Sequence, residues 1–222
     1  MITDPLSSFL PYQDRVRVCL SSKEDGHCTD LIMGGVLGTD HTAALRQMHG
    51  SITHVARSPL ARTEAGDGLV TDQAGLALII RAADCQTFVL YAPDAHVAAV
   101  LHVGWKGLIA GAIHSCMDTL RATWNIDPAR LVVGAGPSLC MSCAEFTDPI
   151  RELPGIDPKF IDGRHTDLRG IADAQWAACG VPTVDRMMDC TKCQADRYWT
   201  YRGGDKEAVM NGATNMLGCV LA

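Results

Sequence analysis

A cysteine and a histidine lie side by side at the open end of a predicted β-hairpin in this chain. The apolar runs 86–91 and 96–102 are typical of buried strands, and the residues between them favour a turn. A turn centred on Pro93-Asp94 pairs Cys85 directly with His102 across the hairpin. Side chains that face each other in this way have Cβ atoms about 4.5 to 5.5 Å apart, a separation that suits two ligands of one metal ion.

His49 could supply a third ligand to the same ion. It lies between a predicted short helix over residues 42–48 and a predicted strand over residues 52–56. Catalytic zinc sites typically have three protein ligands and keep a fourth position for water or substrate. One thiolate and two neutral imidazoles leave a bound zinc ion with a net charge of about +1, which can hold an anionic oxygen or lower the pKa of a bound water. His49, Cys85 and His102 are therefore a candidate metal site.

Two other interpretations of these residues stay open at this point. Buried cysteines are common in protein cores, and a histidine beside a glycine is often a satisfied polar group, so the three residues could be unrelated. Alternatively, Cys85 and His102 could form a thiolate–imidazole nucleophile pair like that of thiol hydrolases.

A second cysteine pattern consists of two C-x-x-C pairs in the last third of the chain. They are Cys140-Met141-Ser142-Cys143 and Cys190-Thr191-Lys192-Cys193. Four thiolates can form a closed structural zinc site, although the two pairs of such sites are usually much closer in sequence. A redox disulfide within either pair and four reduced thiols in a core are the alternatives. The pairs are therefore candidates for a second metal site or for redox thiols.

Several well-known catalytic motifs are missing from the sequence. It contains no G-x-S-x-G, no G-x-G-x-x-G after a strand, no G-x-x-x-x-G-K and no H-E-x-x-H. The zinc deaminase signature, H-x-E followed by P-C-x-x-C, is missing as well. The common hydrolase, dinucleotide, phosphate-loop and zinc-peptidase templates therefore do not apply.

Composition narrows the range of partners and locations. The chain has 222 residues, 47% of them hydrophobic and 20% charged, with a formal net charge of −6. These values match one globular domain and argue against a nucleic-acid surface, so we expect a small-molecule partner. The start of the chain does not resemble a secretory signal, ten cysteines are too few for a disulfide scaffold of this size, and no apolar run is long enough to span a membrane. We expect a cytoplasmic protein that binds neither nucleic acid nor membrane.

Strands and helices alternate irregularly along the chain, which favours a mixed α+β fold. Further strands are predicted over residues 15–20, 68–72, 76–81, 131–133 and 183–188. The helix over residues 106–124 has a clear apolar stripe, and helices are also predicted over residues 168–179 and 206–217. The first forty residues have the weakest pattern.

Several elements of the sequence, taken in order, resemble the laccase-domain family, whose members are described as polyphenol oxidases and as purine nucleoside phosphorylases. The resemblance is carried by Gly68-Leu69-Val70-Thr71-Asp72, Arg81-Ala82-Ala83-Asp84-Cys85 and His102-Val103-Gly104-Trp105-Lys106-Gly107, where the family has patterns close to T-A-D-C and H-A-G-W-R-G. Further elements are Gln47-Met48-His49-Gly50, Gly136-Pro137-Ser138 with Cys143, Cys190-Thr191 and Thr200-Tyr201-Arg202. Together they cover about residues 45 to 205.

The resemblance implies a single domain over residues 1–222, built as a four-layer α-β-β-α sandwich with mixed sheets, and zinc held by His49, Cys85 and His102. It also implies phosphorolysis of adenosine, inosine and methylthioadenosine to the free base and ribose-1-phosphate or its methylthio analogue, with adenosine deamination as a further reaction. The alternatives are a copper-dependent polyphenol oxidase and a catalytically divergent protein that binds metal or acts through its thiols.

Four residues receive roles in this hypothesis. Cys85 and Asp84 are the predicted catalytic residues, and Asp84 could orient a ligand, move a proton or serve a structural role. Lys106 and Arg202 are the predicted phosphate-binding residues, and Lys106 also lies near a helix start, where backbone N–H groups favour anions. The alternative for both residues is a solvated surface charge.

The chain departs from the family pattern at several positions. Ala82 replaces threonine, Lys106 replaces arginine, and Gly203 stands where a second arginine is common. The N-terminal ~40 residues are divergent, and 211–213 replace a terminal Gly-Arg element. Because lysine cannot make the bidentate contact of arginine, phosphate affinity or substrate choice can differ from that of the relatives.

Overall fold

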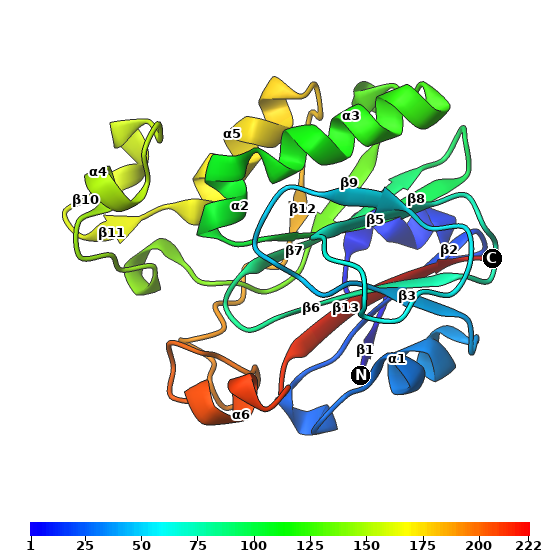
Figure 1. Ribbon diagram of the computed structural model, residues 1–222, viewed down its shortest axis with the longest axis horizontal. Coiled ribbons are helices and arrows are strands. Elements are labelled where there is room, and N and C mark those ends of the chain that lie inside the picture. The colour runs from blue at the N-terminus through cyan, green and yellow to red at the C-terminus, as the bar shows by residue number, and fades with distance from the viewer.

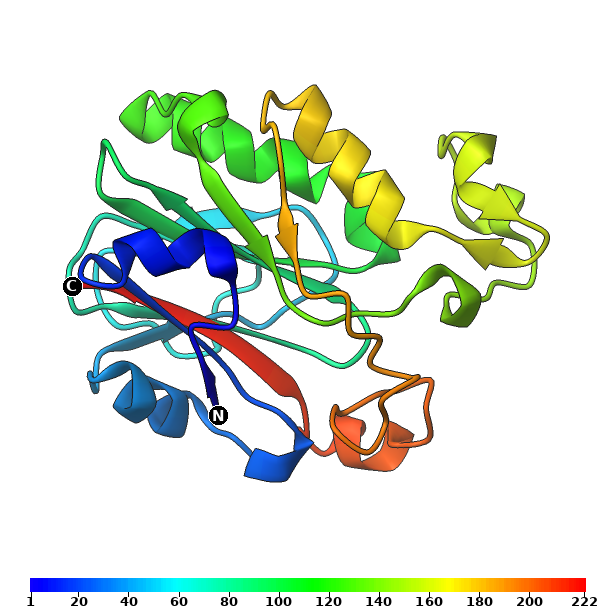
Figure 2. The same ribbon diagram turned by 180° about the vertical axis from the view of Figure 1, so that it is seen from behind.

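Two β-sheets pack face to face, and helices cover both outer faces, as the computed structural model of residues 1–222 shows (Figures 1 and 2). The predicted α+β fold with four layers is thereby confirmed. One apolar core lies between the sheets and includes Leu78, Val89, Val100 and Leu217. A second core lies between one sheet and its helices, and a smaller one lies beneath the helix on the opposite face.

The larger sheet contains the predicted hairpin at its centre. Its six strands are, in spatial order, β12 (Asp185–Arg186), β9 (Val132–Ala135), β7 (Gln86–Ala92), β8 (Val97–Val103), β5 (Gly68–Thr71) and β4 (Thr53–Val55). The outer pairs are parallel and the inner pairs antiparallel, so the sheet is mixed. β7 and β8 are buried along their whole length, as expected for strands with covered faces.

The smaller sheet joins the two ends of the chain. Its five strands are, in spatial order, β1 (Ile2–Thr3), β2 (Val16–Leu20), β13 (Asn215–Leu221), β6 (Ala77–Ala82) and β3 (Thr42–Ala44). Only the pairing of β3 with β6 is parallel. The divergent N-terminal residues thus form an integral part of the domain.

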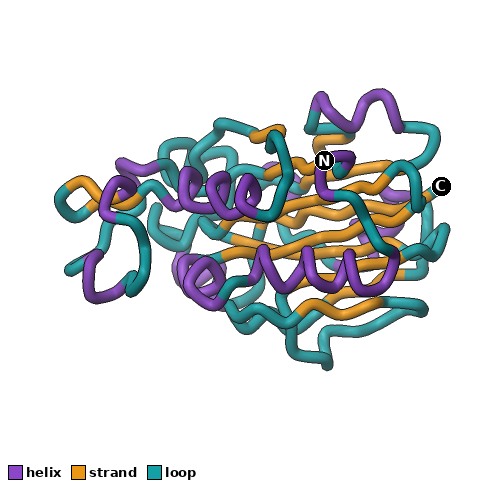
Figure 3. The backbone as a smooth tube through the Cα atoms, turned by 90° about the horizontal axis from the view of Figure 1, so that it is seen from above, coloured by secondary structure: helices purple, strands orange, loops and turns teal.

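Helices complete the outer layers. The larger sheet is covered by α2 (Trp105–Ala110), α3 (Ala112–Trp124) and α5 (Leu168–Ala178), and the smaller sheet by α1 (Asp30–Leu37). A segment with α4 (Pro149–Glu152) and the hairpin of β10 (Ile161–Asp162) and β11 (His165–Thr166) projects from one end, as Figure 3 shows from above. The short helix α6 (Lys206–Met210) precedes β13. None of these helices combines the length and apolar character needed to cross a bilayer.

Three helix predictions need correction. The helix predicted over residues 106–124 is divided at Gly111, whose φ of 75° ends α2 and starts α3. Residues 42–48 do not form a helix, because the chain there pairs with β6 as β3 and then continues in extended form. Tertiary strand pairing outweighs the local helix preference in this segment.

The predicted helix over residues 206–217 is mostly wrong. α6 ends at Met210, Gly212 turns the chain at a φ of 99°, and the following residues form β13 in the middle of the smaller sheet. β13 is buried on both faces, so its apolar residues show no alternation that would mark a strand. Gly218 lets α1 approach closely, because a Cβ there would lie 3.1 Å from Leu37 and Met33.

The register of the β7–β8 hairpin differs from the predicted one by two residues. Thr87, not Cys85, is opposite His102, because the loop spans residues 93–96 and His96 has a φ of 52°. A four-residue loop therefore replaces the two-residue turn. A register shift of two residues leaves every side chain on the same face of the sheet. Cys85 and His102 therefore still share one face, but as diagonal and not as direct neighbours.

Candidate active site

A cavity of about 560 Å³ opens where the turn between β6 and β7 meets the end of β8. The side chains around it combine metal-ligating, cationic and aromatic groups. They include Arg46, Gln47, His49, Arg81, Asp84, Cys85, His102, Trp105, Tyr201 and Arg202. A volume in this range is typical of small-molecule sites, which run from roughly 300 to 1,000 Å³.

His49, Cys85 and His102 converge at this cavity from three separate elements. His49 lies in the loop after β3, Cys85 follows β6 directly before β7, and His102 lies in β8. Their ligand atoms all lie within 4.8 Å of one another, and the two imidazole rings are 4.9 Å apart between centroids. The predicted three-residue group therefore exists as a spatial cluster, with His102 buried and His49 at the open side.

Asp67 organises the two histidines, and sequence reasoning did not identify it. One carboxylate oxygen accepts hydrogen bonds from Nδ1 of His102 at 2.8 Å and from the backbone N–H of His49 at 2.9 Å. The other oxygen accepts the N–H of Gly50 at 2.7 Å. Because Nδ1 of His102 is occupied, Nε2 is the nitrogen free to coordinate a metal. The only sequence signal for this role is a carboxylate placed directly before the buried strand β5.

Burial and hydrogen bonding act in opposite directions on these groups. Burial would raise the pKa of Asp67, but its hydrogen bonds, that from His102 above all, lower it overall. Burial would also raise the pKa of the Cys85 thiol, but hydrogen bonds from His102 and His49 lower it. The pKa of His102 rises despite its burial, because Asp67 and Cys85 stabilise its charged form. The site therefore favours a Cys85 thiolate, the form that binds metal.

Gly104 provides the space in which Cys85 and His49 meet. It is the residue that the register of β7 and β8 places opposite Cys85. A Cβ on Gly104 would lie 3.0 Å from Sγ of Cys85 and 3.0 Å from Cδ2 of His49. The φ of Gly104 is −80°, so space and not backbone conformation favours glycine here.

Asp84 holds the turn that carries Cys85. One of its oxygens accepts hydrogen bonds from the hydroxyls of Thr191 at 2.7 Å and Thr200 at 2.6 Å, and the other accepts the N–H of Arg202 at 2.7 Å. Asp84 is buried and has a φ of 90°, which is rare for a residue other than glycine. Among the roles stated above for Asp84, this geometry favours the structural one.

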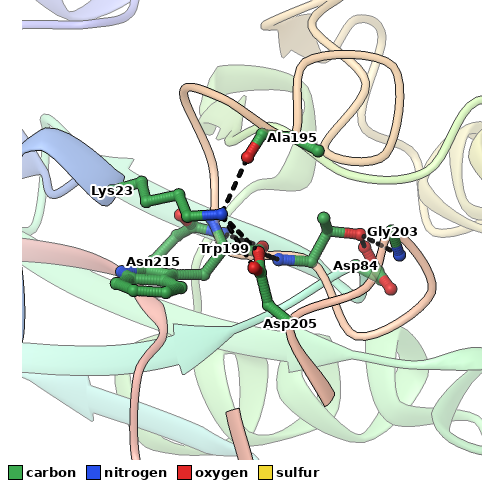
Figure 4. Close-up of polar contacts among 8 residues, drawn as sticks. Lys23, Asp84, Ala195, Trp199, Gly203, Asp205 and Asn215 are labelled. Carbon is green, nitrogen blue, oxygen red and sulfur yellow. Dashed lines mark hydrogen bonds and ion pairs between the residues drawn. The ribbon is translucent and has the colours of Figure 1, made fainter. Parts of the chain in front are cut away.

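Lys23 fastens the segment around residues 195–205, which includes Tyr201 and Arg202, through the contacts drawn in Figure 4. Nζ of Lys23 donates to both carboxylate oxygens of Asp205 at 2.8 Å and to the carbonyl of Ala195 at 2.9 Å. Asp205 in turn accepts the N–H of Thr200 at 3.2 Å. A residue from the divergent N-terminal segment thus supports one wall of the cavity.

Of the two predicted phosphate-binding residues, only Arg202 lines the cavity. Its guanidinium also donates to the carbonyl of Glu145. Lys106 is exposed outside the lining, with Nζ 5.4 Å from the centroid of the Trp105 ring.

Arg46 and Arg81 also line the cavity, and sequence reasoning did not single them out. Arg81 is half-buried, and the one carboxylate whose charge stabilises it, Asp30, forms an ion pair with Arg62. Its guanidinium therefore remains available for an anion in the cavity. The sequence did contain a hint of both roles. Arg81 lies four residues before Cys85, and Arg46 lies three residues before His49.

The two C-x-x-C pairs form a second cluster, separate from the first. The sulfur atoms of Cys140, Cys143, Cys190 and Cys193 all lie within 4.8 Å of one another. No disulfide is present, and all ten cysteines are free thiols.

The chain belongs to the multi-copper polyphenol oxidoreductase laccase family, whose sequence model matches residues 30–217. Among similar proteins is the purine nucleoside phosphorylase ORF3 of Streptomyces griseus, 32% identical over 177 residues that make up 75% of this chain and 71% of that protein. The purine nucleoside phosphorylase SCO2081 of Streptomyces coelicolor is 32% identical over 71% of this chain and 68% of its own length. The adenosine deaminase RL5, from an unknown prokaryotic organism, is 28% identical over 64% and 58%. These relatives support a nucleoside-processing enzyme.

Solved structures confirm the fold. YlmD from Geobacillus stearothermophilus superposes with a TM-score of 0.79 at 19% identity, over 97% of this chain and 93% of its own. The Neisseria meningitidis protein NMB0706 superposes with a TM-score of 0.80 at 19% identity, over 99% and 98%.

Proposed function

We propose that this chain is a zinc-dependent purine nucleoside phosphorylase. It would convert adenosine, inosine or methylthioadenosine and phosphate to the free base and the pentose 1-phosphate, with adenosine deamination as a second reaction. The observation that carries the proposal is the convergence of His49, Cys85 and His102 at the wall of a cavity that also contains unpaired cationic charge. The names of the relatives supply the substrate class.

The donor set fits zinc. One thiolate and two imidazoles match the composition of catalytic zinc sites, and Asp67 provides the carboxylate that typically orients a coordinating histidine. Three protein ligands would leave a fourth coordination position for water or substrate. When bound, zinc supplies a Lewis-acidic positive centre that can hold an anionic oxygen.

The residues of the chain would bind and orient the two substrates. Trp105 and Tyr201 offer aromatic surface for the purine, and Arg81 and Arg202 offer positive charge for phosphate. Lys106 lies outside the cavity lining, so the proposal assigns the phosphate to Arg81 and Arg202 in its place.

In the reaction a phosphate oxygen forms a bond to C1′ of the pentose while the bond from C1′ to the purine nitrogen breaks and its electron pair leaves with the base. The pentose gains positive charge in this transition state. A phosphate dianion held beside C1′ stabilises that charge, and the guanidinium groups keep the dianion in place. The contribution of Arg81 and Arg202 is therefore positioning of the nucleophile.

Phosphate-dependent release of adenine from adenosine tests the proposal. In metal-replete protein we expect adenine and ribose 1-phosphate in equal amounts, and loss of both in Cys85→Ala and after chelation. Arg130→Ala is a matched control, since Arg130 is exposed and pairs with Asp94 at the far end of the hairpin. Release of adenine that does not depend on phosphate, or no turnover of any nucleoside with zinc bound, would contradict the proposal. The second result would favour the catalytically divergent alternative.

A copper-dependent polyphenol oxidase is the second candidate, and the description of the family favours it. Reduction of oxygen to water by multi-copper enzymes needs several copper ions, whereas this cavity presents one set of three ligands. Oxidation of a phenol by the copper-loaded protein, lost in His102→Ala, would support this candidate.

A further inference from the structure

Four cysteine sulfurs lie within 4.8 Å of one another, and none of the four residues lines the cavity. Cys140 precedes and Cys143 ends a 3-10 turn after β9, and Cys190 and Cys193 lie in the loop after β12. Sγ of Cys193 is 3.5 Å from Sγ of Cys143 and 3.9 Å from that of Cys140. Four sulfurs bound tetrahedrally at a Zn–S distance of about 2.3 Å lie about 3.8 Å apart, close to these separations.

The two cysteine loops are also joined through their backbones. Ser138 and Cys190 form a parallel β-bridge, and the N–H of Cys140 donates to Sγ of Cys190 at 3.3 Å. Such N–H···S hydrogen bonds stabilise the negative charge of thiolates. Sγ of Cys190 therefore has a backbone donor that would stabilise its thiolate form.

Arg169 supplies a second, independent indication of negative charge at this place. Its side chain is 7% exposed, and its guanidinium donates to the hydroxyl and carbonyl of Ser138 and to the carbonyls of Met188 and Asp189. All four acceptors are uncharged and belong to the two cysteine loops. No carboxylate forms an ion pair with Arg169, and the nearest carboxylate charges, those of Asp167 and Asp189, act on it without direct contact. A buried guanidinium is costly unless nearby negative charge compensates it. Zinc bound by four thiolates carries a net charge of about −2 and would provide that compensation.

We propose that Cys140, Cys143, Cys190 and Cys193 bind one zinc ion in a closed structural site that fastens the loop after β9 to the loop after β12. The proposal does not depend on the catalytic activity proposed above. It favours a metal over a redox disulfide because Sγ of Cys193 lies near the sulfurs of both Cys140 and Cys143, whereas a disulfide joins one pair only.

This site has a consequence for the cavity. Thr191, the residue after the ligand Cys190, donates its hydroxyl to Asp84 at 2.7 Å, and Asp84 directly precedes Cys85. The cysteine cluster thereby holds the turn that presents Cys85 to the other site. Thr191 and Asp84 are positioning residues in this chain of contacts.

Metal analysis of the purified full-length protein tests the proposal. We expect two zinc ions per chain, one of which is lost in His102→Ala and the other in Cys193→Ser. Cys193→His should retain both ions, because zinc also accepts three cysteines and one histidine. Cys28→Ser is the matched control, since Cys28 is a free cysteine outside both clusters, and it should also retain both ions.

Cobalt substitution provides a readout that does not depend on activity. In the Cys85→Ala protein the remaining Co²⁺ should show the intense sulfur-to-metal absorption of a tetrathiolate site, and this absorption should be weaker when Cys193→His is added to the same protein. Hydrogen exchange of residues 138–145 and 188–202 should accelerate when the ion is removed.

Two results would overturn the proposal. The first is a folded His102→Ala protein without zinc that does not take up one equivalent of Zn²⁺ or Co²⁺. The second is a disulfide among the four cysteines in protein purified without oxygen, detected by mass spectrometry with two fewer titratable thiols. If Cys193→Ser fails to fold, the His102→Ala and Cys193→His proteins still decide the question.

Discussion

The two sulfur-containing clusters of this chain differ in donor set and in access. The cluster of His49, Cys85 and His102 has mixed nitrogen and sulfur donors, three ligands and an opening to a cavity of about 560 Å³. The cluster of four cysteines has sulfur donors only and enough of them to fill a tetrahedral shell. A catalytic metal needs a free coordination position and a structural metal does not. The number of ligands, more than their identity, therefore separates the two clusters.

The clusters also differ in how their ligands reach each other along the chain. The first takes single residues from three elements, and Asp67 holds the two histidines. The second takes two residues from each of two loops, and Arg169 bridges the loops. Thr191 and Asp84 connect the second cluster to the first.

Exchange of one cysteine in each cluster should give the largest and most divergent effects. Cys85→Ala should reduce kcat/KM for adenosine by more than the roughly 10- to 100-fold that loss of an outer-shell metal partner costs, with little change in stability. Cys193→Ser should lower the unfolding free energy by about 3 kcal/mol, which corresponds to a Tm decrease of about 6 to 12 °C in a domain of this size, and should keep measurable activity. Parallel kinetics and thermal unfolding check both. Equal effects of the two variants on activity and Tm would erase the distinction between the clusters.

Asp67→Asn should weaken zinc binding at the first cluster by about 10- to 100-fold and leave the cysteine cluster unaffected. The amide cannot give His102 and the His49-Gly50 turn the same charged acceptor. Competition with a chelator followed by metal analysis measures the effect. Asp72→Asn is the control, because Asp72 pairs with Arg57 away from the cavity. Unchanged zinc affinity in Asp67→Asn would argue against the orienting role.

Arg81→Ala should raise the KM for phosphate by about tenfold, or about 1.4 kcal/mol, with a smaller effect on the KM for adenosine. Lys106→Ala should change the KM for phosphate by less than about twofold, as is usual for an exposed charge outside a site. Initial rates at varied phosphate concentrations distinguish the two. A larger effect in Lys106→Ala than in Arg81→Ala would restore the assignment made from the sequence.

Gly104→Ala should have the smallest effect, a decrease in zinc affinity at the first cluster of roughly threefold, or about 0.7 kcal/mol. The added Cβ would press on Cys85 and His49 at 3.0 Å, and both side chains can yield by a few tenths of an ångström. Gly35→Ala in α1 is the matched control, because no atom lies within 4 Å of its added Cβ. Identical zinc titrations of Gly104→Ala and the parent protein would show that this space is not limiting.

The sequence predicted most of the helices and strands, some of them with wrong bounds. It also predicted the three residues that cluster in the candidate site. The strands around residues 15–20, 52–56, 68–72, 76–81 and 131–133 and the helix over residues 168–179 are confirmed. The strand expected over residues 183–188 is reduced to the two residues of β12. β13 was missed because a strand buried on both faces shows no alternation, and the end of the helix at Gly111 was missed because the apolar stripe continues across it.

Local patterns and the order of motifs were enough to predict the family, the α+β class and the residues that can bind metal, because none of these depends on how distant segments pack. Tertiary structure alone decided that Cys85 meets His102 diagonally and not directly, since a positive φ at His96 lengthens the loop. Tertiary structure also decided that Asp67 accepts hydrogen bonds from both His49 and His102 and that Arg81, not Lys106, lines the cavity. The two C-x-x-C pairs meet across residues 144–189 for the same reason: contacts between distant segments depend on how sheets and loops pack, which no local spacing encodes.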